Sequence, residues 1–279
     1  MKTVAELSKG SSKSPGSERR IAGLLFGVAT HVLFAFTVWA LFFFLRDGRP
    51  GQAGPGGLAV DFGLALAFAI PHSLLLWPPC AQRLKRWIIP HFYGCFYCVV
   101  TCVALLAMFS LWRGHAVIVW EATGWVRWSV QAAFLGSWVA LFYSLSLTGL
   151  GYQTGFTPWW YWVRGQALPR REFVPRGAYH YLRHPVYLSF LGLIWFTPRM
   201  TLDHAILTGV WTIYIFFGSH LKDERLAYFL GTSYREYQAR VPAYVGFVER
   251  LAGTVLGAFA KLWKMLEGRP SVPRGSREA

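Results

Sequence analysis

The chain has 279 residues, of which 54% are apolar and 18% aromatic, while only 15% carry a charge. Soluble domains normally have about 25% charged residues, and disordered chains, coiled coils and disulfide-stapled secreted domains also differ from this composition. The net charge of +15 would suggest nucleic acid in a soluble protein, but the basic residues here lie between apolar runs, where they set topology and contact anionic lipid. These values predict a polytopic membrane protein that binds no nucleic acid.

Apolar runs long enough to cross about 30 Å of hydrocarbon recur along the chain. The first four are residues 21–45, 58–77, 92–112 and 128–150. A fifth run, 184–196, is short, and residues 197–200 follow it as a predicted tight turn before a sixth run at 205–221. The last two runs therefore predict a helical hairpin packed against the other helices. The expected fold is an all-α transmembrane bundle of about five or six spans.

The distribution of Lys and Arg predicts the orientation of these spans. With six crossings, 23 of the 28 Lys and Arg residues fall in the segments on one side of the membrane. The positive-inside rule assigns that side to the cytoplasm. We therefore expect a multi-pass protein of a bacterial inner membrane with both termini in the cytoplasm.

The two ends of the chain differ from the spans. Residues 1–20 are rich in Lys, Ser and Gly, which predicts a disordered basic arm. From Phe247 to Leu266 apolar residues recur at helical spacing beside Lys261 and Lys264, a pattern typical of a helix lying in the membrane interface. Four regions are expected: the arm 1–20, a four-helix region 21–150, a core 151–245 that carries the polar motifs, and an amphipathic helix with a disordered tail, 246–279.

Three cysteines, Cys95, Cys98 and Cys102, fall on one face of the third apolar run, and Cys80 lies near the end of the second. Their C-x2-C-x3-C spacing is compatible with an iron–sulfur or zinc site. Such sites usually lie on loops and have four ligands, whereas cysteine is also a small apolar residue suited to close helix packing in lipid. We expect a packing role and no metal site.

Polar residues collect in two places late in the chain. One is the run from Gly177 to Tyr187, which contains Arg183, His184 and Pro185 and leads into the fifth apolar run. The other is the Lys-Asp-Glu-Arg sequence at 222–225, which follows the sixth run. If the last two runs form a hairpin, the two clusters lie side by side at one membrane face.

The residue types in these clusters match the chemical groups of S-adenosylmethionine. Pro185 fits the first turn of a helix, which leaves backbone N–H groups free for an anion, and Arg183 can bind a carboxylate in a bidentate manner. Asp223 and Glu224 can accept hydrogen bonds from an ammonium group or from ribose hydroxyls. Three tyrosines offer ring faces to a cation such as the sulfonium: Tyr179, Tyr181 and Tyr187. Contact of Arg183 and His184 with lipid headgroups is the alternative interpretation.

Further residues follow the run from Tyr179 to Tyr187 in a fixed order. They are Trp195, Thr197, Pro198, Met200, Thr201, the acidic pair, Gly231, Tyr234 and Tyr237. Together these motifs resemble the integral-membrane methyltransferases of the isoprenylcysteine carboxyl methyltransferase superfamily, which includes phospholipid methyltransferases. His72-Ser73-Leu74 and a third span that ends in Trp112 are similar to the branch of methanethiol S-methyltransferases and NnrU-like proteins.

The resemblance implies a pocket for S-adenosylmethionine on the cytoplasmic side. Arg183, His184 and Pro185 match the Arg-His-Pro motif, Tyr187 matches its following tyrosine, and Glu224 matches the acidic motif, from which Asp223 is a departure. Because the family often has two adjacent glutamates where this chain has Asp223-Glu224, the carboxylate that contacts the cofactor stays open. The implied reaction is methylation of a small thiol such as methanethiol. An isoprenylcysteine carboxyl or phospholipid N-methyltransferase with a lipid-like acceptor, or a non-catalytic NnrU-like protein, is the alternative.

His72 is the expected catalytic base. Methyl transfer from a sulfonium is an in-line displacement, in which alignment of the reactants supplies about 7–11 kcal/mol. A thiol acceptor has an ordinary pKa of about 8.5, so a basic side chain would favour the reactive thiolate. Ionisable residues inside spans are costly and therefore point to function, which favours His72. An interhelical hydrogen bond is the alternative role of this histidine.

Overall fold

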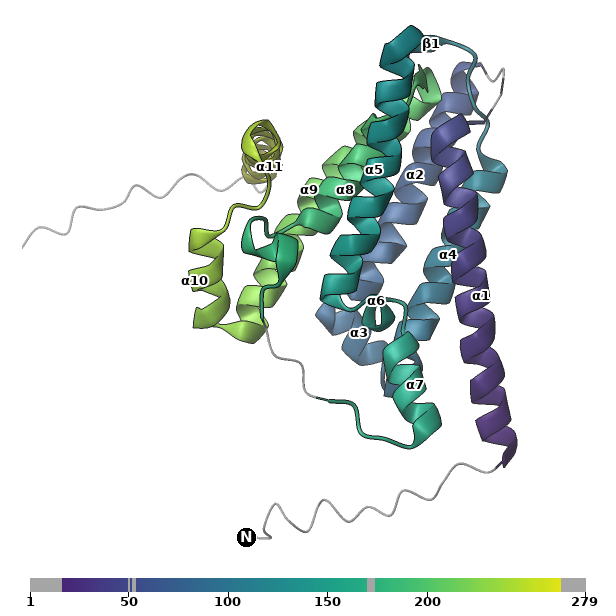
Figure 1. Cartoon of the computed structure of the whole chain (residues 1–279), viewed down its shortest axis with the longest axis vertical. Helices are drawn as coiled ribbons and strands as arrows, with labels where there is room; N and C mark the ends of the chain where they lie inside the picture. The colour runs from purple at the N-terminus through teal and green to yellow at the C-terminus, as the bar shows by residue number, and fades with distance from the viewer. Residues whose placement is uncertain (1–16, 50, 52–53, 170–173, 267–279) are drawn as a thin grey trace, which may run out of the picture.

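Long helices running side by side form the body of the molecule (Figure 1). The computed structural model describes residues 17–49, 51, 54–169 and 174–266. The long helices are α1 (Ser17–Asp47), α2 (Pro55–Leu76), α4 (Tyr93–Leu111), α5 (Gly124–Thr148) and α9 (Leu202–Leu230). The shorter apolar helix α8 (Pro185–Trp195) packs between α5 and α9. The prediction of an all-α bundle is confirmed.

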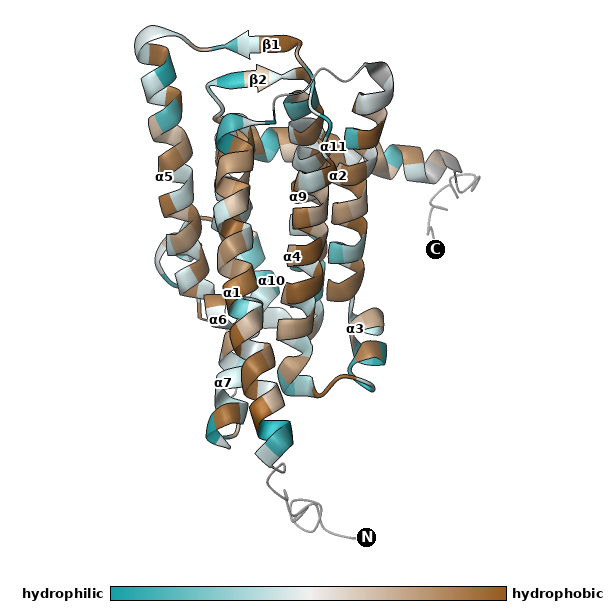
Figure 2. Ribbon diagram, turned by 90° about the vertical axis from the view of Figure 1, so that its right-hand side faces the viewer, coloured by the Kyte–Doolittle hydropathy of each residue, from teal (hydrophilic) through white to brown (hydrophobic). Residues whose placement is uncertain are grey.

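Four helices, α1, α2, α4 and α5, are long and apolar enough to cross a membrane. Figure 2 shows apolar residues along most of their length. Each of the first five predicted runs coincides with a helix to within four residues at either end. These helices, with α8 as a shorter apolar helix, make the protein a multi-pass membrane protein by length and composition.

Short elements join the long helices at both ends of the bundle. At the end where α1 begins lie α3 (Pro78–Leu84), α6 (Leu150–Gln153) and α7 (Phe156–Arg164), and at the opposite end lies the first strand (Figure 1). The 3-10 turns η2 (Pro90–Phe92) and η3 (Gly177–His180) precede α4 and α8. Helices α10 (Thr232–Arg240) and α11 (Gly246–Leu266) follow α9 and lie to one side of the bundle (Figure 1).

Three predicted boundaries differ from the structure. Helix α1 begins at Ser17, so residues 17–20 are helical and not part of a disordered arm; residues 1–16 and the predicted tail at 267–279 lie outside the described residues. Residues 197–200 are not merely a tight turn, because β2 (Arg199–Thr201) pairs antiparallel with β1 (Ile118–Glu121). Helix α9 continues to Leu230, past the predicted end at Leu221, so the acidic pair is helical.

Two buried carboxylates hold the loop before β1. Oδ1 and Oδ2 of Asp61 accept the backbone N–H groups of Arg113 at 2.7 Å and Gly114 at 3.2 Å. Asp203 accepts the indole N–H of Trp112 at 2.8 Å and the backbone N–H of His115 at 3.1 Å. A carboxylate removed from water needs such donors. The loop therefore ties the start of α2, the end of α4 and the start of α9 together.

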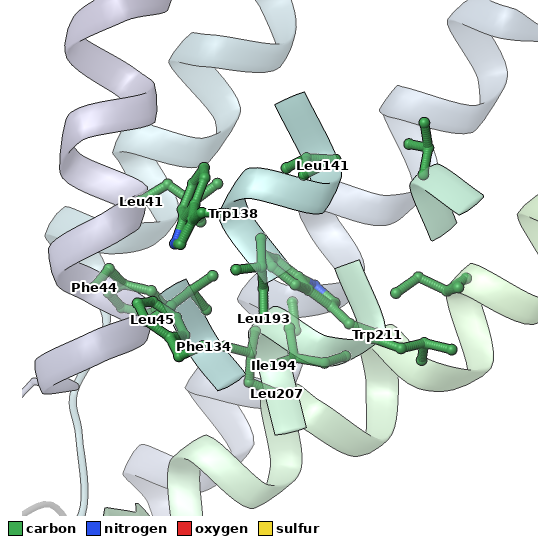
Figure 3. Packing of buried hydrophobic residues seen from close by; sticks show 14 of the residues in the cluster. Leu41, Phe44, Leu45, Phe134, Trp138, Leu141, Leu193, Ile194, Leu207 and Trp211 are labelled. Atoms are coloured by element: carbon green, nitrogen blue, oxygen red, sulfur yellow. The ribbon is translucent and has the colours of Figure 1, made fainter. Parts of the chain in front are cut away.

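The core of the bundle lies between α1, α5, α8 and α9. Figure 3 shows the side chains that meet there: Leu41, Phe44, Leu45, Phe134, Trp138, Leu141, Leu193, Ile194, Leu207 and Trp211. Helix α8 approaches α5 closely at Gly192, where an added Cβ would lie 2.2 Å from Oγ of Ser137. Small residues allow such close approach of helices in lipid, where dispersion contacts drive association. This packing fixes α8, and with it the polar motif at its start.

The three cysteines of α4, Cys95, Cys98 and Cys102, are buried in the helix packing. The Sγ of Cys95 lies 3.6 Å from the carbonyl oxygen of Gly155 in the loop before α7. Among the described residues, no group of three or more His, Cys, Asp and Glu side chains is arranged to hold a metal ion. The cysteines thus occupy packing positions between α4 and its neighbours.

Candidate functional site

The two polar motifs come together where α8 begins and α9 leaves the bundle. Pro185 occupies the first turn of α8, with His184 as its N-cap. The backbone N–H groups of Arg183 and His184 donate to the carbonyl oxygens of Pro242 at 2.9 Å and Ala243 at 3.2 Å. The segment before α8 is thereby held against the segment that follows α10.

Asp223 is the centre of this site. Its Oδ2 lies 3.2 Å from Nη2 of Arg183, and its Oδ1 lies 3.1 Å from Nε2 of His184 and accepts the hydroxyl of Tyr234. Asp223 is 4% exposed, whereas the adjacent Glu224 is exposed. The buried carboxylate of the acidic pair is therefore Asp223, and Glu224 lies outside the cluster.

The electrostatics of the cluster keep Asp223 charged. Burial raises the pKa of its carboxyl, but the hydrogen bonds of His184 and Tyr234 and the charge of Arg183 outweigh burial, so the pKa lies below its usual value. For His184 burial dominates and lowers the pKa below its usual value, despite the neighbouring carboxylate. At neutral pH the site therefore holds a carboxylate, a guanidinium and a neutral imidazole.

Nε of Arg183 and Nδ1 of His184 are buried without a hydrogen-bond partner within the described ranges, and Nε2 of His184 faces Oδ1 of Asp223 at 3.1 Å without meeting ordinary hydrogen-bond geometry. The Nη1 of Arg183 donates to the carbonyl oxygen of Gln238 at 2.6 Å, and its Nη2 contacts Asp223. Because a carboxylate only accepts, Nε2 of His184 carries the proton that faces Asp223, and Nδ1 is then an acceptor. Nε of Arg183 is a donor. The site thus offers one donor and one acceptor to a ligand.

A cavity of about 140 Å³ opens beside these atoms. Arg183, His184, Asp223, Tyr244 and Glu249 are among the residues that line it. A free donor beside a free acceptor suits the carboxylate and ammonium groups of an amino acid, because buried polar groups require partners. The residues present therefore fit the methionine end of S-adenosylmethionine.

The predicted aromatic faces already carry a cation of the chain itself. The ammonium of Lys222 lies 5.4 Å from the ring centroid of Tyr187 and 6.0 Å from that of Tyr179. Burial lowers the pKa of Lys222 to about 8, which makes loss of its proton easier when a second cation arrives. Tyr181 is 76% exposed and lines a larger neighbouring hollow. The three tyrosines thus have different surroundings.

His72 lies on α2, separate from the Asp223 cluster. Its Nδ1 is 2.5 Å from the hydroxyl of Tyr214 on α9, and its Nε2 is 2.5 Å from the hydroxyl of Tyr97 on α4. Oγ of Ser73 donates to the same hydroxyl of Tyr214 at 3.2 Å. This geometry contains the interhelical hydrogen bond that was the alternative role of His72. It also leaves each ring nitrogen in contact with a group able to pass on a proton.

Tyr187, on α8, lies beside α9 between the Asp223 cluster and the His72 cluster. Tyr214 and Asp223 are nine residues apart on this helix, a rise of about 13 Å. The hydroxyl of Tyr187 donates to the carbonyl oxygen of Gly218 between them at 3.4 Å, and it is close enough to Tyr214 to interact electrostatically. A ligand in the Asp223 cluster and one beside His72 would approach each other at Tyr187.

Sequence reasoning missed three contributors to the site: Lys222, Tyr234 and Glu249. Tyr234 stood in the motif that carries the resemblance, but eleven residues would separate it from Asp223 by about 16 Å in one continuous helix. Their contact exists because the chain turns at Gly231 between α9 and α10, which the spacing alone does not show. Glu249 lies on α11, a helix expected only at the membrane interface. Its place in the cavity lining follows from tertiary packing and leaves no local sequence signal.

Comparisons with known proteins agree with the motif-based resemblance. Methanethiol S-methyltransferase 1 of Bradyrhizobium diazoefficiens is 28% identical over 242 residues, which cover 80% of this chain and 81% of that protein. Methanethiol S-methyltransferase of Mycobacterium tuberculosis is 26% identical over 240 residues, covering 80% of this chain and 95% of that protein. Nurim of Xenopus laevis is 27% identical over 184 residues, covering 61% of this chain and 63% of that protein.

No family model matches the chain, and no solved structure matches it significantly. The matches to the two methanethiol S-methyltransferases nevertheless extend over about four-fifths of the sequence, well beyond the region 175–242 that carries the polar motifs. They confirm the predicted resemblance: the chain is a homologue of proteins named methanethiol S-methyltransferase, consistent with the superfamily of membrane methyltransferases related to isoprenylcysteine carboxyl methyltransferase.

Proposed function

We propose that the protein is an integral-membrane methyltransferase that uses S-adenosylmethionine to methylate a small thiol, with methanethiol as the acceptor. The observation that supports S-adenosylmethionine as the cofactor is the free donor Nε of Arg183 beside the free acceptor Nδ1 of His184 in a buried cavity. The acceptor is supported by the relatives that match 80% of the chain, which are methanethiol S-methyltransferases.

In this proposal Arg183 binds the carboxylate of the cofactor and His184 accepts its ammonium group. Asp223 holds both side chains in place through its contacts of 3.2 Å and 3.1 Å. The bound cofactor supplies an electrophilic methyl group. Tyr187 and Tyr179 present their ring faces near it, and Lys222 leaves those faces or loses its proton to relieve the repulsion between like charges.

On the acceptor side, His72 receives the thiol proton. The tyrosine hydroxyl that faces the unprotonated ring nitrogen can relay that proton to the ring, because a hydroxyl donates as well as accepts. The thiolate sulfur then uses its electron pair to form the new carbon–sulfur bond, and the donor leaves as a neutral thioether. Alignment of the two reactants supplies most of the acceleration.

The decisive experiment uses purified protein with S-adenosylmethionine and methanethiol, and measures dimethyl sulfide by gas chromatography. Parallel reactions with an isoprenylcysteine and with a phosphatidylethanolamine test the lipid-like acceptors. Turnover of the thiol alone supports the proposal. Turnover of a lipid-like acceptor alone would replace the substrate class, and binding without any turnover would favour a non-catalytic protein.

His72→Ala should lower the rate of thiol methylation by about 10²- to 10⁴-fold at pH 6, with nearly unchanged affinity for S-adenosylmethionine. The defect should shrink as the pH approaches the thiol pKa of about 8.5, because solution then supplies the thiolate. Rates for wild type and variant from pH 6 to 9 measure this. His31→Ala is the matched control, since His31 lies on α1 and bonds only the Gly27 carbonyl among the described residues. A defect that is flat with pH would leave His72 with a structural role.

We further propose that both termini lie in the cytoplasm of a bacterium whose inner membrane holds the protein. The support is a sequence count: if the chain crosses six times, 23 of the 28 Lys and Arg residues fall in the segments on the same side as the N-terminus. Alkaline phosphatase fused at either terminus should be inactive, whereas fusion within the loop between α1 and α2 should be active. If the phosphatase were active at one terminus and inactive at the other, the chain would cross the membrane an odd number of times, which would contradict the proposal.

A further inference from the structure

Two hollows adjoin at the start of α11. The smaller, of about 140 Å³, is the polar cavity beside Arg183, His184 and Asp223. The larger, of about 500 Å³, is lined mainly by apolar and aromatic groups, among them Tyr181, Leu182, Pro242 and Val245. Glu249 and Tyr244 line both. Together they have the size of a pocket for a ligand larger than an amino acid.

Glu249 is held at the junction of the two hollows. Its Oε2 accepts the backbone N–H of Tyr244 at 2.6 Å, which fixes the direction of the carboxylate. The side chain is half-buried, and its Oε1 makes no hydrogen bond or ion pair within the part of the chain that the structure describes. A fixed carboxylate with one oxygen available accepts hydroxyl donors strongly, because charge-assisted hydrogen bonds exceed neutral ones.

The sequence of chemical groups along the two hollows matches the order of groups in S-adenosylmethionine. The amino-acid end fits the polar hollow, and a flat purine fits the larger apolar hollow, where the ring of Tyr181 is available for stacking. The ribose joins these two parts of the cofactor, and Glu249 joins the two hollows. Resting on the proposed function, we infer that Glu249 binds the ribose hydroxyls of the cofactor and that α11 thereby forms one wall of the nucleoside site.

The test measures binding and not turnover. Isothermal titration of the purified full chain with S-adenosylhomocysteine, and with its 2′-deoxy and 3′-deoxy analogues, gives the contribution of each hydroxyl. Wild type should bind the natural ligand about 10- to 100-fold more tightly than at least one analogue, the range expected for hydrogen bonds to a charged group. Glu249→Gln should weaken the natural ligand by the same factor while leaving that analogue unchanged, so the selectivity disappears.

Two controls separate this role from a structural one. Glutamine can still accept the N–H of Tyr244, so the thermal midpoint of Glu249→Gln should stay close to that of wild type. Glu236→Gln changes an exposed carboxylate on α10 and should leave affinity and selectivity unchanged. If Glu249→Gln weakens all three ligands equally, or none of them, Glu249 does not contact the ribose. If wild type binds none of them, the proposed cofactor is wrong and this assignment falls with it.

Discussion

Asp223→Asn should reduce the affinity for S-adenosylmethionine by about 10²- to 10³-fold, whereas Glu224→Gln should leave it within about twofold of wild type. Removing one partner of a buried ion pair costs about 3–5 kcal/mol, because the other charge stays buried without compensation. Asp223 is the buried partner of Arg183 and of His184, and Glu224 is exposed. The two variants change neighbouring carboxylates by the same chemistry, so each controls for the other.

Calorimetric titration of both variants measures this difference, and thermal unfolding in the same detergent shows whether each protein remains folded. The hydroxyl of Tyr234 also donates to Asp223, so a moderate fall in the unfolding midpoint is expected for Asp223→Asn alone. If Glu224→Gln lost binding and Asp223→Asn retained it, Glu224 would be the protein carboxylate that contacts the cofactor. Asp223 would then be only a structural group.

Arg183→Ala should abolish detectable binding of the same cofactor, and Arg183→Lys should restore only part of it. The guanidinium bonds the carbonyl of Gln238 and the carboxylate of Asp223 through its two terminal nitrogens, while Nε remains for the ligand. A lysine supplies one point charge and cannot make three contacts in fixed directions. Truncation to alanine also leaves the buried carboxylate of Asp223 without its cationic partner, although His184 and Tyr234 still contact it.

The matched control for Arg183 is Arg235→Ala, which removes an exposed arginine from α10. Its affinity for the cofactor should equal that of wild type. Equal binding by Arg183→Ala and wild type would exclude Arg183 from the cofactor pocket. Full rescue by lysine would show that charge alone matters and that the planar geometry of the guanidinium does not.

The bundle was predictable because uncharged apolar runs of span length have few alternatives to a membrane helix. The strands β1 and β2 were not predictable. Arg199–Thr201 contains only three residues, which are too few for an alternation of polar and apolar residues to distinguish a strand from a turn. The end of α9 was also missed. Hydropathy falls at Lys222, but helical hydrogen bonding continues to Leu230, because charged residues with good helix propensity continue a helix beyond the hydrocarbon.

For the site, residue chemistry identified the two motifs but not the division of tasks within them. Asp223 and Glu224 are equivalent in sequence, and only the direction in which each leaves α9 makes one buried and the other exposed. Sequence likewise assigned the faces of Tyr179 and Tyr187 to a ligand cation, whereas Lys222 of the same chain lies there. Such competition between internal and external partners depends on side-chain distances, which sequence spacing does not give.

The carboxylates Asp61 and Asp203 have a consequence for how the molecule moves. They bind four successive residues, Trp112 to His115, and they belong to different helices, so this end of the bundle opens only if several hydrogen bonds break together. Amide protons of Arg113, Gly114 and His115 should therefore be among the slowest to exchange with deuterium outside the helices. At the end where α8 begins, Asp223 contacts side chains of α10 and of the segment before α8, and the other links between elements are single hydrogen bonds such as that from Arg225 to the carbonyl of Leu76. Ligand entry can then loosen that end while the far end acts as a fixed pivot for the helices.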